Sequence, residues 1–214
     1  RDSASGTRGG SAGSNNAVVS IQTPIDADAS TLYWSNALGS GTGSRSTGCP
    51  LLVDGVLIVY AGDTLYRIDP VSGEILTQAK MDHASSFSIT PPAYAKGMVF
   101  VGLSDGTIQA FDAKTLQSLW IYHDPLEGQP NSPITICGDY LYTGFWRSEE
   151  FPANFVCLSI TDEDPTRTDE EKTACWYWTN PGGYYWAGAY ACEDYVLVGT
   201  DDGADESTSM TGSL

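Results

Sequence analysis

The chain has 214 residues, which is enough for one large all-β domain, and its 27 acidic and 10 basic residues give a formal net charge of −17. This charge argues against nucleic-acid and anionic-membrane partners, because both need a basic protein surface. No stretch approaches the ~20 consecutive apolar residues of a membrane-spanning helix, so we expect no membrane insertion.

Residues 1–30 differ in composition from the rest of the chain. The first part, RDSASGTRGGSAGSNN, is rich in Gly, Ser and Asn and contains almost nothing to bury. We expect residues 1–30 to form a flexible leader that continues into a surface segment. The chain starts at Arg1 rather than at Met, which is compatible with removal of a signal peptide.

Residues 31–214 repeat a unit of short β-rich runs that are separated by Gly/Asp turns. The clearest unit is KGMVFVGLSDGTIQAFDAKTLQSLWIY, at residues 96–122. Val56, Met98, Tyr140 and Tyr195 open the equivalent run in four successive units. A period of roughly 40–50 residues, with about four strands in each unit, is typical of β-propeller blades.

We therefore predict an all-β fold, namely a β-propeller of four-stranded antiparallel blades. We expect about seven or eight blades in the complete protein, of which this chain holds about half. The predicted parts are a closing strand at 31–38, blade one at 46–81, blade two at 86–123, blade three at 130–179 and half of blade four at 184–214. The expected partner is the rest of the propeller, as a second segment or fragment, because open sheet edges expose unpaired backbone groups.

Two stretches, DGVLIVYAGDTLYRIDPVSGEIL at 54–76 and KGMVFVGLSDGTIQAFDAKTLQSLW at 96–120, carry a family resemblance. They resemble the pyrroloquinoline-quinone-like (PQQ-like) repeats of the quinoprotein alcohol dehydrogenase-like superfamily. In that pattern a strand ending in Asp, here Asp69 or Asp112, precedes a strand that ends in a docking tryptophan. Trp34, Trp120 and Trp178 fill the docking position.

The stretch GQPNSPITICGDYLYTGFW at 128–146, together with the insertion DEDPTRTDE at 162–170, extends the resemblance. Both are similar to surface propellers of unknown activity in Gram-positive anaerobic bacteria. This part of the resemblance implies an extracellular or cell-surface location.

Loop length separates the two faces of the predicted propeller. Strand direction alternates within a blade, so the loops between strands two and three share one face with the connections between blades. These loops are longer and richer in aromatic residues than the turns between strands one and two, and we predict that they bind a glycan or a peptide. The candidate ligand-binding residues are Phe87, Asn131, Trp146, Arg147, Tyr184, Tyr185 and Trp186. The alternative is that these rings only pack the loops onto the blades.

Calcium is a candidate ion for one acidic loop. This loop offers several hard oxygen ligands close together, from Asp201, Asp202, Asp205 and Glu206. The segment 162–171 is also acidic, but Arg167 stands where a calcium loop of this type needs a turn-forming glycine. Solvated acidic loops are the alternative for both. His83 and His123 are the only histidines and there is no CxxC motif, so we expect no zinc site.

The five cysteines allow at most two internal disulfides. Cys157 and Cys175 would lie on neighbouring strands of blade three and could pair. Cys137 and Cys192 occupy the same position of the innermost strand in successive blades, which indicates small buried packing residues.

The resemblance also bears on enzymatic activity. Quinone-dependent dehydrogenases of this superfamily hold their cofactor with two adjacent, disulfide-linked cysteines and with calcium beside a catalytic Asp. This chain has no adjacent cysteines, so we expect no PQQ, and we assign no catalytic residue. The expected function is that of a secreted or surface-attached binding or scaffold propeller. The alternative is a PQQ-dependent oxidoreductase-like quinoprotein.

Overall fold

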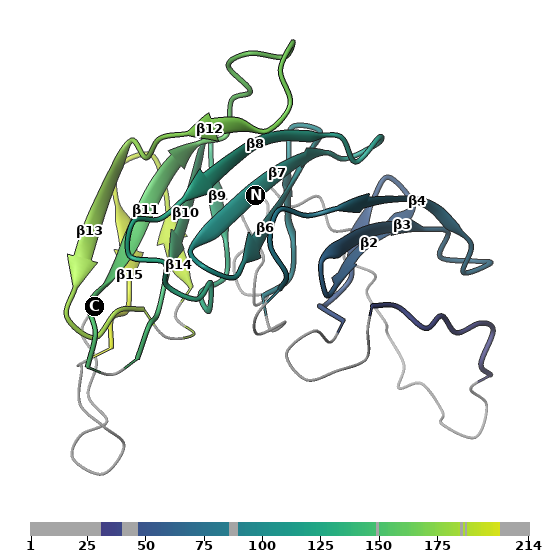
Figure 1. Cartoon of the computed structure of the whole chain (residues 1–214), viewed down its shortest axis with the longest axis horizontal. Coiled ribbons are helices and arrows are strands. Elements are labelled where there is room, and N and C mark those ends of the chain that lie inside the picture. Colours follow the sequence, from purple (N-terminus) through teal and green to yellow (C-terminus); the bar gives the residue numbers. More distant parts are fainter. Residues whose placement is uncertain are drawn as a thin grey trace.

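The computed structural model describes residues 31–39, 47–85, 90–148, 150–184, 186 and 188–201, and their regular structure is β-strand (Figure 1). Blade one contains β1 (Leu51–Val53), β2 (Val56–Ala61), β3 (Thr64–Ile68) and β4 (Ile75–Lys80). Blade two contains β5 (Ala93–Ala95), β6 (Met98–Leu103), β7 (Thr107–Asp112) and β8 (Ser118–His123). Blade three contains β9 (Thr135–Cys137), β10 (Tyr140–Gly144), β11 (Ala153–Ser159) and β13 (Trp176–Asn180). The short β12 (Glu170–Lys172) precedes β13, and β14 (Ala189–Ala191) and β15 (Val196–Val198) belong to blade four.

Each of the first three blades is a meander whose consecutive strands pair antiparallel, β1-β2-β3-β4, β5-β6-β7-β8 and β9-β10-β11-β13. Among the described residues of blade four, β14 pairs antiparallel with β15. These sheets confirm the predicted all-β fold of four-stranded antiparallel propeller blades. No helix in the described part of the chain is long and apolar enough to cross a membrane.

Two-residue turns join the first two strands of blades one and two. Asp54 and Gly55 have φ angles of 48° and 77°, and Lys96 and Gly97 have φ angles of 50° and 80°. Two successive positive φ angles are the conformation of the tight hairpin turns that match the twist of antiparallel strands. This geometry explains why Gly ends both turns.

An aspartate closes the turn between the third and fourth strands of blades one and two. The Asp69 carboxylate accepts hydrogen bonds from the backbone N–H groups of Val71 and Ser72, at 2.8 and 2.7 Å. Asp112 accepts the equivalent bonds from Lys114 and Thr115, at 3.0 and 2.7 Å. In blade three the same register position holds Ser159, because Ser159 pairs with Tyr140 as Asp112 pairs with Met98. There the tight turn is replaced by the insertion that contains β12.

The hydrophobic core lies between successive blades. Along β6, Phe100 packs towards blade three, whereas its neighbours Val99 and Val101 pack towards blade one. Side chains alternate between the two faces of a strand, so a strand that is covered on both faces needs apolar residues at nearly every position. This explains the continuous apolar run at 98–103.

β12 adds a fifth strand to the sheet of blade two, which the sequence did not predict. Glu170, Glu171 and Lys172 pair in parallel with residues 120–122 of β8 (Figure 1). The insertion leaves β11 at the face that carries the two-residue turns, so this face also carries a long segment. Polar residues form β12 because its strand lies at the outer edge of the sheet.

A tryptophan on the outer strand of blade two reaches across to blade three. The Trp120 indole is fully buried, its Nε1–H donates to the Ile160 carbonyl at 3.4 Å, and its ring lies 5.7 Å from the Phe100 ring. The Lys172 Nζ atom lies over the Trp120 ring, 5.2 Å from its centroid. Lys172 also donates to the Thr161 carbonyl at 2.6 Å and pairs with Glu163 at 3.2 Å.

Trp34 makes a similar contact on blade one. Its Nε1–H donates to the Pro70 carbonyl at 2.9 Å, and its ring lies so close to Gly73 that a Cβ atom there would be 2.6 Å from Trp34. However, residues 31–38 form no strand in this structure, so the closing strand expected there stays a prediction. In the described residues no neighbouring strand lies beside this segment to supply ladder hydrogen bonds.

The contacts of Lys172 predict a stability difference between two lysines. Replacing Lys172 by Ala should lower the free energy of unfolding by about 2 kcal/mol, because hydrogen bonds to charged groups contribute about 1.5–3 kcal/mol and this side chain is only 3% exposed. The control is Lys96→Ala, which removes an exposed ion pair with Asp139 that contributes about 0–1 kcal/mol. Urea unfolding curves measure both variants, and equal losses would contradict the role of Lys172.

Candidate binding surface at the loop face

We define the loop face as the side of the propeller that carries the loops between strands two and three of each blade and the connections from one blade to the next. Three of these segments meet on the loop face. Gln129, between β8 and β9, pairs with Trp146, which follows β10, through two backbone hydrogen bonds of 2.6 and 2.9 Å. The Tyr184 N–H, between β13 and β14, donates to the Phe145 carbonyl at 2.9 Å. The Ser132 hydroxyl donates to the Tyr184 carbonyl at 3.1 Å. Blades two, three and four therefore hold one continuous surface.

Glycines allow these connections to approach one another closely. A Cβ atom on Gly144 would lie 2.5 Å from the Tyr184 Cβ, and one on Gly128 would lie 2.7 Å from the Phe145 Cβ. Real Cβ atoms do not approach so closely, so a larger residue at either position would push two loops apart. The surface is thus held by packed backbone rather than by long side chains.

One cation and three aromatic side chains lie on these loops, and we call them the loop-face patch: Trp146, Arg147, Phe151 and Trp186. The Arg147 Cζ atom lies 5.4 Å from the centre of the Phe151 ring. Phe151 is 52% and Trp186 is 61% exposed, so neither ring is part of the hydrophobic core. Trp186 has a φ angle of 56°, a backbone conformation that is uncommon for residues other than glycine and that is often found at functional sites.

Phe151 was missed by the sequence reasoning, which considered its loop but not its ring. Ser148 and Phe151 form an isolated bridge within the loop, which folds the chain back at this point. This turn places Phe151 beside Arg147. The signal in the sequence was an aromatic residue four positions after Arg147 in a loop that is too polar to be a strand.

Two of the predicted ligand-binding residues, Tyr184 and Asn131, are buried in this structure. Tyr184 is 0% exposed, its ring lies 5.4 Å from the Phe155 ring, and its hydroxyl donates to the Trp178 carbonyl at 3.2 Å. Burial raises the pKa of Tyr184 to about 12. Asn131 is only 4% exposed. These side chains support the loops, as the alternative interpretation held. The predicted residues Phe87 and Tyr185 lie outside the described residues.

The predicted calcium ligands can be followed only at Asp201, whose N–H donates to the Gly183 carbonyl at 3.0 Å. Asp202, Asp205 and Glu206 lie outside the described residues. In the other acidic segment, Asp164 accepts a 2.6 Å hydrogen bond from the Thr166 hydroxyl, which lowers the pKa of the carboxyl. Within the described ranges, no group of three potential metal ligands includes a residue of this segment.

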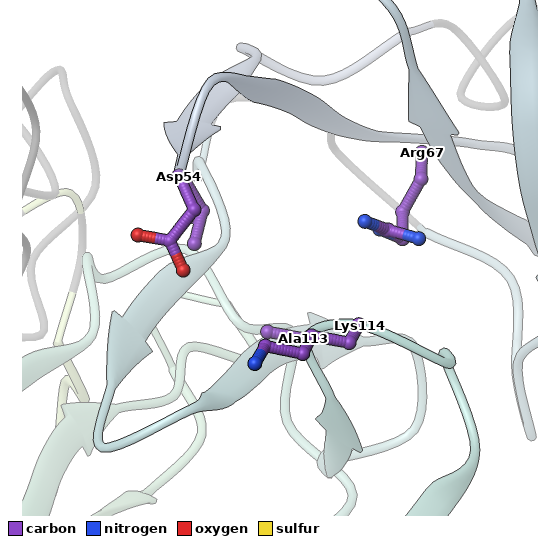
Figure 2. A pocket seen from close by; sticks show the side chains of 5 residues that line it. Asp54, Arg67, Ala113 and Lys114 are labelled. Carbon is purple, nitrogen blue, oxygen red and sulfur yellow. The ribbon is translucent and has the colours of Figure 1, made fainter.

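A pocket of about 300 Å³ lies on the opposite face, between blades one and two. Figure 2 shows Asp54 on one side of it, Arg67 on the other and Lys114 below them. The Arg67 Nε atom is buried and has no hydrogen-bond partner among the described residues. This pocket was not predictable from the sequence, because its residues come from separate turns and strands of two blades.

The structure brings His83 and His123 together, which the sequence reasoning did not expect. His83 lies between β4 and β5, and His123 is the last residue of β8. Their ring centres are 6.0 Å apart, and Asp82 lies between them. The missed signal was the spacing of the two histidines, which equals about one blade repeat.

All five cysteines are free thiols in the structure. Cys157 is buried on β11, and the Cys175 N–H donates to its carbonyl at 2.9 Å, so the two residues are neighbours as predicted. Burial and the nearby Cys175 raise the pKa of Cys157 to about 12. No two cysteines are adjacent in the sequence. The residues present therefore do not fit the cysteine pair that the resemblance implies for a bound quinone.

Comparison with known proteins places this fold in a family. A family model described as outer membrane protein assembly factor BamB matches residues 18–150. A quinoprotein ethanol dehydrogenase from Pseudomonas aeruginosa is 31% identical over 103 residues, and a quinohemoprotein alcohol dehydrogenase from Comamonas testosteroni is 33% identical over 116 residues. These matches cover 48% and 50% of the chain but only 16% of either relative.

A solved quinohemoprotein alcohol dehydrogenase from Pseudomonas putida HK5 has a similar fold, with a TM-score of 0.50 and 19% identity. The match covers 61% of this chain and 20% of that structure, so the chain corresponds to part of a larger propeller. The family model covers more than half of the chain. The chain therefore belongs to the PQQ-like repeat β-propellers of the quinoprotein alcohol dehydrogenase and BamB-like superfamily.

Proposed function

We propose that this chain belongs to a secreted or surface-attached propeller that binds a glycan or a peptide at the loop-face patch. The observation that carries the proposal is the exposed Arg147, whose guanidinium lies over the exposed Phe151 ring, together with the exposed Trp186 on the connection to blade four. Flat aromatic faces bury the apolar faces of sugars or peptide side chains, and a guanidinium donates several hydrogen bonds to their oxygens.

The rigidity of the loops supports a preformed site. The backbone bonds between residues 129 and 146 and between 145 and 184 fix the patch on three blades at once. A ligand that binds such a surface orders few additional groups, so less free energy is lost on binding. Loops that served only to connect blades would gain nothing from two large exposed rings, since exposed apolar surface contributes no hydrophobic stabilisation.

A quinone-dependent oxidoreductase is not proposed. The curated relatives carry such names, but the chain matches only 16% of their length. The paired cysteines that the resemblance implies have no counterpart here. We therefore assign no catalytic residue.

We also infer that further blades of the same propeller pair with this chain. Trp176 on β13 stands where Trp120 stands on β8, because Trp176 pairs with Cys157 as Trp120 pairs with Ala110. Trp176 is 43% exposed, whereas Trp120 is 0% exposed, and the predicted docking residue Trp178 lies two positions further along the strand. Trp120 and Trp34 each dock on the segment that follows the third strand of a blade. For Trp176 that segment would belong to blade four, beyond β15. A further segment that completes blade four would bury this indole.

The ligand proposal predicts which variants lose binding on glycan and peptide arrays. Trp186→Ala and Arg147→Ala should each weaken binding of the retained ligand by about tenfold or more, because truncating a Trp or Arg that anchors a binding surface costs on the order of 2 kcal/mol. Lys114→Ala, on the opposite face, is the matched control and should bind as the parent does. Binding that is unchanged in the first two variants would place the site elsewhere.

The blade inference predicts the composition of natively purified material. Denaturing mass spectrometry should detect a second segment, or a longer chain that continues this one, in the same complex. A lone chain of these 214 residues that is monomeric and melts in one cooperative transition would contradict the inference.

A further inference from the structure

We propose that Asp82, His83 and His123 form a binding site for a divalent transition-metal ion of the zinc class. The site lies on the loop face, where the connection between blades one and two meets the end of β8. It is independent of the proposed glycan or peptide site, which lies on blades three and four.

The three side chains converge on one point. The His83 Nδ1 atom lies 2.6 Å and the His123 Nε2 atom 3.2 Å from the same carboxylate oxygen, Oδ2 of Asp82. One potential ligand atom from each residue lies within 4.8 Å of the other two. Zinc binds imidazole nitrogen and carboxylate oxygen at about 2.0–2.2 Å, so tetrahedral ligand atoms are separated by about 3.3–3.6 Å. Rotamer adjustments of about 1 Å would therefore bring the three atoms around one ion.

The backbone that carries these side chains is held on both sides. The Asp82 N–H donates to the Gln109 side-chain oxygen at 2.8 Å, and the preceding Met81 N–H donates to the Asp63 carbonyl at 2.8 Å. His123 pairs with Thr107 in the sheet of blade two. Because two separate elements fix the ligands, much of the ordering cost of a metal site is already met by folding.

A second carboxylate supports the orientation of His83. The Asp105 Oδ2 atom lies 3.7 Å from the His83 Nε2 atom, on the opposite side of the ring from Asp82. A metal-binding histidine usually presents its other ring N–H to a carboxylate, carbonyl or water, which fixes the tautomer. The 3.7 Å separation is too long for a hydrogen bond, but a side-chain shift of about 0.5–1 Å would let Asp105 accept that proton when Nδ1 faces the ion.

The donor set selects the class of ion. Two imidazoles and one carboxylate suit Zn²⁺ and its neighbours in the first transition row, whereas calcium prefers oxygen ligands alone. The side chains of the three residues are 33–43% exposed, so an ion there would keep coordination positions that face solvent. The acidic chain, with its net charge of −17, favours a cation at this place.

The two histidines make a direct test possible, because they are the only ones in the chain. Titrating Zn²⁺ into the protein while recording the ring C–H signals of histidine by NMR should shift both signals together and reach completion at one equivalent. The cysteine thiols also bind zinc, but they do not produce this coupled change at two imidazoles. If neither histidine signal changes at saturating Zn²⁺, or if only one does, the proposal is wrong.

Single substitutions distinguish the proposed metal ligands from neighbouring residues that do not bind the ion. His123→Ala and Asp82→Asn should each weaken Zn²⁺ binding, read at the remaining histidine signals, by more than tenfold, and Asp105→Asn by about tenfold. Asp139→Asn, an exposed carboxylate elsewhere on the chain, is the matched control and should leave the affinity unchanged. Equal affinity in all four variants would overturn the proposal. If a variant fails to fold, the titration of the unmodified chain still decides the outcome.

Discussion

The buried indole of Trp120 is the contact on which the arrangement of the blades depends. Its ring lies against Phe100 of its own blade, its N–H donates to the Ile160 carbonyl of blade three, and the Lys172 Nζ atom lies over the ring. A side chain with partners in two blades fixes their relative position, because moving either blade exposes a large apolar surface and leaves an indole N–H unpaired. The contact between Lys172 and Trp120 also joins the insertion that precedes β13 to blade two, where β12 forms an additional strand.

Once the blades are fixed, the loops between them become a preformed surface. The loop-face patch is held where three connections bond to one another, and the pair of histidines is held where a connection passes the end of a strand. Both candidate sites therefore lie on irregular segments whose positions are set by the sheets beneath them. This division explains why a family with one scaffold can place different chemistry on the same face.

The repeat pattern was sufficient to predict the blades. Alternating apolar runs and Gly/Asp turns are local features, so β6, β7 and β8 could be read from residues 96–122 alone. The parallel pairing of β12 with β8 could not, because a strand of three residues with the sequence EEK has no apolar pattern and pairs with residues about fifty positions away. Residues 31–38 show a similar limit, since Trp34 contacts a blade as a docking tryptophan but the described residues supply no strand for its segment to pair with.

The candidate site was predictable only in part, because exposure depends on packing between blades. Trp186 and Arg147 each follow an aromatic residue and are exposed, whereas Tyr184 lies two positions before Trp186 and is buried against Phe155. Composition does not distinguish these cases. The convergence of His83 and His123 could have been inferred from their separation of one repeat, which brings equivalent ends of neighbouring fourth strands together.

The most direct test of this account is hydrogen exchange at the tryptophan indole N–H groups, measured by NMR on ¹⁵N-labelled protein with assignments from single Trp→Phe variants. The account predicts strong protection for the Trp120 N–H, which is buried and donates to the Ile160 carbonyl, relative to the exchange rate of a free indole. If the Trp120 N–H exchanges as rapidly as a free indole, the contact does not hold blade two against blade three, and the preformed loop face loses its structural basis.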